Sequence, residues 1–218
     1  ILFLMKYDGL KEYLKPVLIR FLCIEVGWLS SITVNHRTAL TRQQFESKAG
    51  YNDDSLDAIR DIQSHDAGFY RIKKGFSSSL AEHDSIKDAM VQGFYGTPSY
   101  SSFNKQEYIN FLTSTEVIDQ SNERQTRWAT GLYLRPLLQA LTSVKYNLVK
   151  PEFLQKTQTS DLLRRVYIPG KKFGDVTVMK NLFSLPLGFT YDSYILKQDF
   201  EKLPKEIKPI SLFKAAVL

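Results

Sequence analysis

The most apolar stretch of the chain, residues 17–34, places the strongest constraint on what it can fold into. A membrane-spanning helix needs roughly 20 mostly apolar residues, so this stretch is barely long enough. Arg20 lies near one end, where a long side chain carries its charge towards the interface. Glu25 lies near the middle, where a charge costs about 3 kcal/mol unless it faces protein. The residues alone leave two interpretations open: a spanning helix with Glu25 turned inward, or a buried helix or strand of a soluble domain.

The composition is that of a folded protein. The chain has 218 residues, of which 43% are hydrophobic and 24% are charged, enough for one large core or two small ones. The net charge is +6, but 29 basic residues are spread among 23 acidic ones, so we expect no nucleic-acid binding. A single cysteine, Cys23, excludes an internal disulfide and paired-cysteine redox or zinc chemistry.

Short helices and strands are expected in the rest of the chain. Asn52 is a helix-capping residue type, and a helix is predicted over residues 53–64 with aspartates in its first turns. Residues 69–73 predict a short strand. A second helix is expected to begin at Asp84, with Met90 on its buried side.

The later part of the chain has more strand-like segments. Asn104 opens a capping-box pattern that predicts a third helix, and residues 144–149 alternate as a strand does. Residues 162–168 and 175–180 are predicted to pair across the turn-forming loop 169–172.

These elements predict an α+β fold. A further strand is expected where apolar residues alternate over 187–191, and Trp128 is expected to be a core anchor. No repeat or flexible linker divides the chain, so we expect one α+β domain over residues 41–218, a mixed sheet with short flanking helices. A hydrophobic segment, residues 1–40, precedes it and contains the candidate membrane helix.

The histidine, serine, glycine and acidic residues show no catalytic or metal-binding pattern in this sequence. The three histidines are far apart and lack a second ligand at helical spacing, so we expect no metal site. No serine follows a nucleophile-elbow pattern, and no glycine-rich phosphate loop is present. Four acidic residues close in sequence are interpreted as a solvated helix face: Asp53, Asp54, Asp57 and Asp61.

The segment 93–104 combines aromatic and polar side chains on a short backbone. Aromatic faces pack against the C–H groups of sugars, and fixed polar groups bind sugar hydroxyls, so this segment is a candidate glycan site. The alternative is that its aromatic residues are buried and its serines satisfy a long turn. The candidate ligand-binding residues are Arg71, Tyr95, Ser99, Tyr100, Ser101, Ser102 and Asn104.

Basic residues offer two places for an anionic partner. Arg71 is able to pair with a phosphate or carboxylate, or to donate a structural hydrogen bond to loop carbonyls. A basic group at the predicted hairpin either contacts anionic lipid or polymer or forms an ordinary solvated tip. That group comprises Arg164, Arg165, Lys171 and Lys172.

A series of short fragments in a fixed order resembles the YfhO-like family of bacterial membrane proteins. Each fragment is weak alone, and their order and spacing carry the resemblance. They are Asn52-Asp53-Asp54, Phe69-Tyr70-Arg71, Gly93-Phe94-Tyr95-Gly96, Ser99-Tyr100-Ser101-Ser102-Phe103-Asn104, Val144-Lys145-Tyr146 and Leu185-Pro186-Leu187-Gly188-Phe189-Thr190-Tyr191.

The resemblance implies a segment of a longer protein in the bacterial cell membrane, following the membrane bundle. It favours the spanning interpretation of residues 17–34 and implies an extracytoplasmic location for residues 41–218. The parent protein would resemble lipid-linked-sugar-dependent glycosyltransferases that act on cell-surface polymers such as lipoteichoic acid. Their catalytic carboxylates belong to early loops, so no catalytic residue and no cofactor is expected here.

Two roles for the segment follow from that resemblance. In the first, it positions the acceptor glycan or an anionic polymer beside its own membrane bundle. In the second, it is a structural or protein-interaction module without glycan binding. An exposed aromatic and polar surface around residues 95–104 would favour the first role, and burial of those aromatic residues would favour the second.

Overall fold

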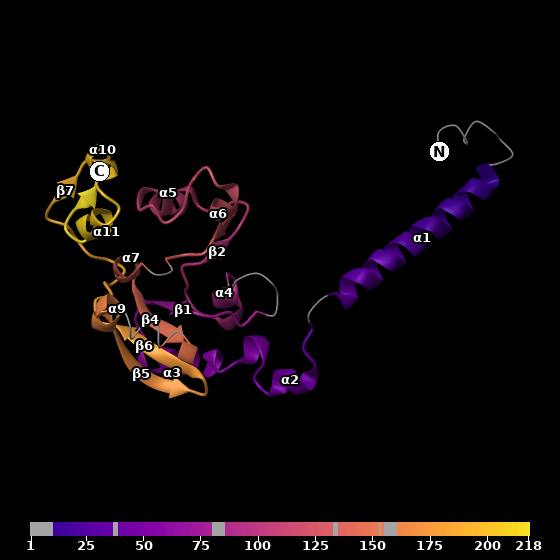
Figure 1. The fold of residues 1–218 in the computed structure, drawn as a ribbon, viewed down its shortest axis with the longest axis horizontal. Coiled ribbons are helices and arrows are strands. Elements are labelled where there is room, and N and C mark those ends of the chain that lie inside the picture. Colours follow the sequence, from indigo (N-terminus) through magenta and orange to yellow (C-terminus); the bar gives the residue numbers. More distant parts are fainter. Residues whose placement is uncertain (1–10, 37–38, 80–85, 133–134, 153, 155–160) are drawn as a thin grey trace. The chain divides into compact units, whose positions relative to one another are not determined.

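The computed structural model describes residues 11–36, 39–79, 86–132, 135–152, 154 and 161–218 (Figure 1). The chain divides into two compact units, Ile1–Ala39 and Leu40–Leu218. Each unit is described by itself below.

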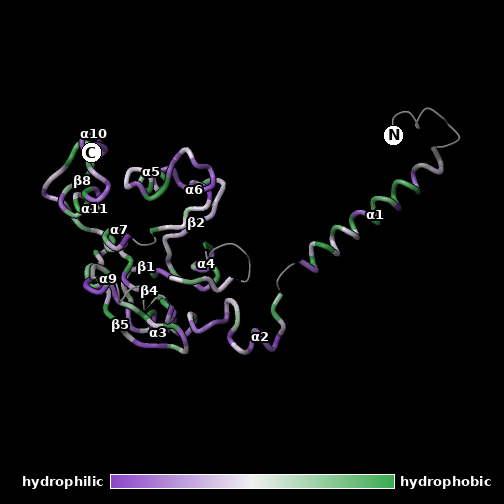
Figure 2. The backbone as a smooth tube through the Cα atoms, viewed as in Figure 1, coloured by the Kyte–Doolittle hydropathy of each residue, from purple (hydrophilic) through white to green (hydrophobic). Residues whose placement is uncertain are grey.

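The first unit contains one long helix, α1 (Lys11–Asn35). Its part Lys15–Asn35 is long and apolar enough to cross a membrane, as judged by length and composition. Hydrophobic residues run along most of this helix in Figure 2, and large ones such as Phe21 and Trp28 are exposed. The apolar stretch predicted from the sequence is therefore a helix without a protein core of its own.

The second unit is built around a four-stranded mixed sheet with the order β1-β4-β6-β5 (Figure 1). Strand β1 (Arg71–Lys74) pairs in parallel with β4 (Val144–Val149). Strand β6 (Val176–Asn181) is antiparallel to both β4 and β5 (Tyr167–Phe173). The predicted α+β class and mixed sheet are confirmed.

Helix α3 (Ser55–His65) forms the principal core with this sheet. Ile59 and Ile62 lie one turn apart on its buried face and belong to the same cluster as Ile72 and Leu148 of the sheet. Each buried side chain of this size contributes about 1.5–3 kcal/mol by leaving water. The apolar stripe predicted for this helix is thus what attaches it to the sheet.

Shorter elements surround the sheet, and a second buried cluster is formed by Leu112, Ala129, Leu132 and Leu138. Two small two-stranded sheets are present, one of β2 (Ser99–Tyr100) with β3 (Trp128–Ala129), the other of β7 (Tyr194–Ile195) with β8 (Ala216–Val217). The remaining described helices are α2 (Arg42–Glu46), η3 (Gly50–Asn52), α4 (Asp88–Gln92), α5 (Gln106–Ser114), α6 (Glu123–Arg127), α7 (Pro136–Leu141), α9 (Asp161–Val166), α10 (Lys197–Glu201) and α11 (Ile207–Ser211).

The predicted start of the first helix of this unit is wrong. Helix α3 begins at Ser55, and Asn52 donates its side-chain hydrogen bond to the carbonyl of Phe45 instead of capping the helix. The carboxylate of Asp53 accepts the bond from the Ser55 amide at 3.0 Å. A preceding 3₁₀ turn, Gly50–Asn52, therefore holds the predicted cap residue, and the helix begins two residues later than predicted.

The predicted hairpin exists, but its turn lies elsewhere. Gly174, with φ of +51°, forms the turn together with Asp175, and residues 169–172 lie within β5 at an irregularity in the pairing. Residues of the expected first strand form helix α9, where Leu163 and Val166 are one turn apart and face the same apolar cluster.

Two further local predictions are wrong because tertiary contacts override them. Met90 is exposed, since the buried residues of α4 are Asp88 and Gln92, and the predicted start at Asp84 lies outside the described residues. Residues 187–191 form no strand, and no described strand pairs with them. Alternation without a partner does not make a strand.

Candidate functional site

The segment after α4 runs beside the edge strand β1. Gly93 ends α4 in the left-handed region, with φ of +73°, which glycine adopts at little cost. The carbonyl of Tyr95 then accepts a hydrogen bond of 2.8 Å from the amide of Ile72. This contact fixes the segment Gly93–Ser99 against the sheet, with cavities on both of its sides.

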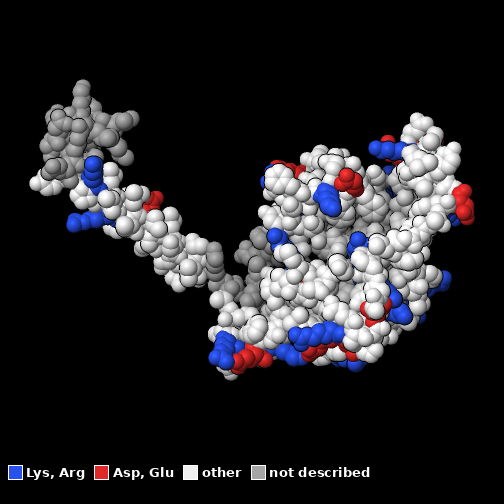
Figure 3. All heavy atoms as spheres, turned by 180° about the vertical axis from the view of Figure 1, so that it is seen from behind, with Lys and Arg blue, Asp and Glu red and all other residues white. Residues whose placement is uncertain are grey.

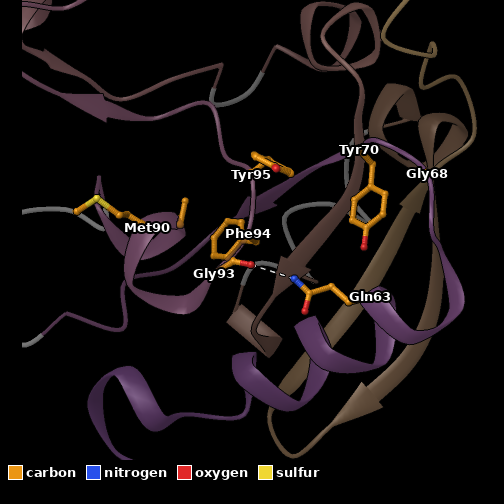
Figure 4. Close-up of a pocket in the computed structure, with 8 residues that line it drawn as sticks. Gln63, Gly68, Tyr70, Met90, Gly93, Phe94 and Tyr95 are labelled. Carbon is orange, nitrogen blue, oxygen red and sulfur yellow. Dashed lines mark hydrogen bonds between the residues drawn. The ribbon is translucent and has the colours of Figure 1, made fainter.

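The first of these, here called the aromatic cavity, has a volume of about 470 Å³. In Figure 4, Tyr95 and Phe94 lie on one side of it and Tyr70 and Gln63 on the other. The Gln63 amide donates a 2.9 Å hydrogen bond to the Gly93 carbonyl, which ties α3 to the segment. The Tyr95 side chain is 66% exposed and its ring lies 5.2 Å from that of Phe69.

The described lining contains the polar side chains of Gln63, Tyr70 and Tyr95, and the Tyr70 hydroxyl belongs to the buried one. Burial raises the pKa of this tyrosine, and the charge of Asp66 adds to the effect. No described residue hydrogen-bonds to that hydroxyl. The cavity thus combines aromatic walls with a protonated hydroxyl able to donate or accept a hydrogen bond.

The second, here called the arginine cavity, has a volume of about 420 Å³. Arg71 lines it together with hydroxyl residues, among them Thr97 and Ser99, and with the exposed side chain of Leu187. The Tyr108 hydroxyl donates a 2.6 Å hydrogen bond to the Thr97 carbonyl and so supports this wall. Burial raises the pKa of Tyr108 to about 12, although the charge of Arg71 opposes the rise.

The sequence leaves two roles open for Arg71, and the structure shows one of them, a structural hydrogen bond to a backbone carbonyl. Its guanidinium donates to the Thr142 carbonyl at 2.7 Å and lies 5.1 Å from the ring centre of Phe69. Burial lowers the pKa of this guanidinium, and Tyr108 opposes the change. An arginine remains charged in a protein at such a site, so a half-buried positive charge lines the cavity.

Of the other predicted site residues, some form hydrogen bonds within the protein and one is exposed at the surface. The Ser99 hydroxyl donates to the side chain of Asn104, which itself donates to the carbonyls of Thr126 and Arg127, so Asn104 does not cap α5. The Ser101 hydroxyl accepts from the amide of Phe103, as in a local turn. Ser102 is exposed and lines neither cavity.

Tyr100 is separate from both cavities and stacks on Trp128. Their ring centres are 4.1 Å apart and their planes are tilted by 32°. Trp128 is half-buried, so it is a surface stacking partner rather than the predicted core anchor. The Lys87 ammonium lies 5.1 Å from the Tyr100 ring centre and adds a cation–π contact.

A buried polar cluster beneath α4 was not predicted from the sequence. The Lys74 ammonium pairs with Asp88 at 2.7 Å and donates to Gln92 at 2.8 Å, and the pair is almost fully buried. Ser78 joins the cluster by donating its hydroxyl to Asp53 and its amide to Asp88. Asp53 is therefore buried, and the prediction that all four neighbouring aspartates form a solvated face is wrong for it.

Charged residues are mixed over the face shown in Figure 3, where Lys and Arg alternate with Asp and Glu. At the predicted basic tip, Lys171 pairs with Asp61 of α3. No group of three or more His, Cys, Asp and Glu side chains suited to a metal ion occurs among the residues that the structure describes.

Comparison with known proteins identifies the family. The sequence model of the family described as "Bacterial membrane protein YfhO" matches residues 1–211, which is nearly the whole chain. No curated protein and no solved structure among those compared matches the chain. The long apolar helix α1 agrees with membrane association. The chain belongs to the YfhO family of bacterial membrane proteins.

Proposed function

We propose that residues 40–218 are the extracytoplasmic, non-catalytic domain of a glycosyltransferase that uses a lipid-linked sugar and acts on a cell-surface polymer. In this proposal the aromatic cavity positions the acceptor glycan beside the membrane bundle. The observation that supports it most is the exposure of Tyr95 at the mouth of a cavity with further aromatic walls.

The chemistry of the cavity suits a neutral sugar. The face of an aromatic ring carries partial negative charge, so it attracts the weakly positive C–H groups of a sugar ring. The Tyr70 hydroxyl provides a hydrogen-bonding group inside the cavity. A volume of about 470 Å³ falls in the range of roughly 300–1,000 Å³ of small-molecule sites.

Binding of neutral oligosaccharides to the full chain in detergent micelles tests this role, with saturation-transfer NMR as the readout. Tyr95→Ala is expected to weaken binding about tenfold, or about 1.4 kcal/mol, whereas Tyr95→Phe keeps the ring and retains the affinity. Phe103→Ala is the matched control, because Phe103 is 92% exposed and lines neither cavity. Equal affinities for Tyr95→Ala and the wild type would remove the glycan role.

Labelling in intact cells tests the proposed side of the membrane. Phe103→Cys introduces a thiol at an exposed position of a chain whose natural cysteine is Cys23, within α1. A membrane-impermeant maleimide is expected to label the variant in intact cells and not the wild type. Labelling that requires cell lysis would put the domain on the cytoplasmic side.

One observation favours the alternative role as a protein-interaction module. Several large apolar side chains after β6 are exposed: Leu182, Phe183, Leu187, Phe189, Tyr194 and Leu196. These residues lie close together in the sequence, and a contiguous exposed apolar patch typically marks a protein-docking site. If this role holds, Phe183→Ser destabilises the full-length protein in membranes while Tyr95→Ala leaves both its stability and its polymer product unchanged.

A further inference from the structure

The arginine cavity contains a positive charge that has no acidic partner among the residues the structure describes. Arg71 is the charged residue in its described lining, which otherwise consists of hydroxyl, glycine, proline, aromatic and aliphatic residues. No described carboxylate forms an ion pair with Arg71. By contrast, Lys74 of the same strand, β1, and Lys145 of the adjacent strand, β4, each form an ion pair with an aspartate.

The guanidinium is not satisfied by its structural role. It has five N–H donors in a planar fork, and its described hydrogen bond uses one nitrogen, for the Thr142 carbonyl. The ring of Phe69 covers part of its surface. A half-buried charge whose remaining donors have no partner in the described part of the protein is unfavourable, and a bound anion would compensate it.

Hydroxyl residues add polar groups to the surroundings of Arg71. Thr97, Ser99, Thr142 and Ser143 contribute to the same lining, and the cavity of about 420 Å³ is larger than a phosphate or carboxylate group alone. The Thr142 hydroxyl donates to the Leu138 carbonyl and the Ser99 hydroxyl to Asn104, so Arg71 is the principal donor for an anion. The arginine fork binds phosphate and carboxylate groups in a bidentate manner.

We infer that the arginine cavity binds the phosphate or carboxylate group of a sugar-sized ligand, with Arg71 as the residue that contacts the oxyanion. This site is separate from the aromatic cavity, and the inference holds whether or not that cavity binds a neutral glycan. Sugar phosphates and sugar acids share the required chemistry, so the ligands of the test must distinguish them.

The test uses the full chain in detergent micelles and measures dissociation constants by saturation-transfer NMR. Glucose 1-phosphate and glucuronate are the two anionic ligands, and glucose is the neutral one. Inorganic phosphate is expected to displace a bound anionic sugar, while the same concentration of chloride is not. Binding of only one anionic sugar would support the site and identify its oxyanion. If neither anionic sugar binds at about 20 mM, a concentration on the order of ten times a millimolar dissociation constant, the inference is overturned.

Two kinds of variant connect binding to this cavity. Leu187 is 63% exposed in its lining, so Leu187→Glu adds a competing carboxylate without disturbing a core, and Leu187→Gln is the matched neutral control. We expect Leu187→Glu to weaken anion binding at least tenfold and Leu187→Gln to change it less than twofold. Unchanged affinity in Leu187→Glu would contradict the inference.

Arg71→Gln removes the charge and keeps a donor for the Thr142 carbonyl. It is expected to lose detectable anion binding while its circular dichroism spectrum stays that of the wild type. Tyr95→Ala is expected to leave anion affinity within twofold of the wild type, because Tyr95 lines the other cavity. This last variant separates failure of the glycan proposal from failure of the anion site.

Discussion

Tyr70 and Arg71 are neighbours in the chain, yet they line different cavities, Tyr70 the aromatic one and Arg71 the arginine one. Successive side chains of an extended chain point to opposite sides, and Arg71 is the first residue of β1. The segment opposite them also contributes to both cavities, with Tyr95 lining the first and Thr97, where the chain bends, lining the second. Strand β1 and the segment beside it thus create two cavities of different chemistry.

The position of that segment depends on a close approach by Gly131. A Cβ atom added there would lie 2.5 Å from the Thr97 hydroxyl, and its φ of +79° is already unfavourable for other residues. Gly131→Ala is expected to cost about 1–2 kcal/mol in backbone strain plus about 1–3 kcal/mol from overpacking. Gly93→Ala is the control: its φ of +73° carries the strain, but nothing lies within 4 Å of the added Cβ. Equal losses in urea unfolding would contradict the close approach.

The buried pair of Lys74 and Asp88 predicts a large loss of stability when one partner is removed. Asp88→Asn leaves a buried ammonium without its carboxylate, which typically costs about 3–5 kcal/mol. Urea unfolding of the chain in mild detergent measures this loss. Glu46→Gln breaks the exposed pair with Arg42 and is expected to cause no measurable change. A loss below about 1 kcal/mol for Asp88→Asn would show that the pair is hydrated.

Asp66 predicts a dependence of stability on pH. Burial alone would raise the pKa of this carboxyl, but hydrogen bonds from Lys145, Tyr146 and the Gly68 amide outweigh burial and lower it. The unfolded carboxyl has a pKa of about 3.9, so its stabilisation is complete well above that pH and is lost as the pH falls through the lower folded value.

The variant that measures this effect is Asp66→Asn. It is expected to lower the free energy of unfolding by about 1.5–3 kcal/mol at neutral pH, with the difference from the wild type shrinking below about pH 4. Asp119→Asn, an exposed aspartate with local bonds to Ser121, serves as the comparison. A difference for Asp66→Asn that stays constant down to pH 2 would contradict the assigned contacts.

The composition of helix α1 predicts that it inserts into a membrane and that the charge of Glu25 opposes this insertion. Glu25 lies near the middle of Lys15–Asn35, and replacing it with leucine removes a penalty of about 3 kcal/mol. A glycosylation-mapping assay is expected to show more inserted segment for Glu25→Leu than for the wild type, and no change for Val26→Leu. An uninserted Glu25→Leu segment would show that α1 is not a spanning helix.

The sequence predicted those elements whose formation depends on local pattern. Strand β4 has the expected bounds, 144–149, although its burial does not alternate, since Asn147, Leu148 and Val149 are all buried. The stripe of Ile59 and Ile62 also lies where helical spacing puts it. Turn and cap positions were less predictable. The hairpin turns at Gly174 and not at residues 169–172, because the position of the turn depends on how the two whole strands pair.

The polar sites required contacts that no local pattern encodes. Asp53 is buried because Ser78 and Gln92, 25 and 39 positions away, bring their donors to it. Arg71 finds its carbonyl 71 positions away, at Thr142. The sequence named Arg71, Tyr95 and Ser99 as site residues, but their division between two cavities follows from the pairing of the segment with β1.

Methionine methyl NMR tests the central claim, that the aromatic cavity binds a neutral glycan, most directly. Met90 is 73% exposed at the cavity, and Met179 is buried in a different cluster. Titration of the methyl-labelled full chain with neutral oligosaccharides is expected to shift the Met90 signal saturably, to leave Met179 unmoved, and to fail in Tyr95→Ala. An unmoved Met90 signal at millimolar glycan would contradict the account.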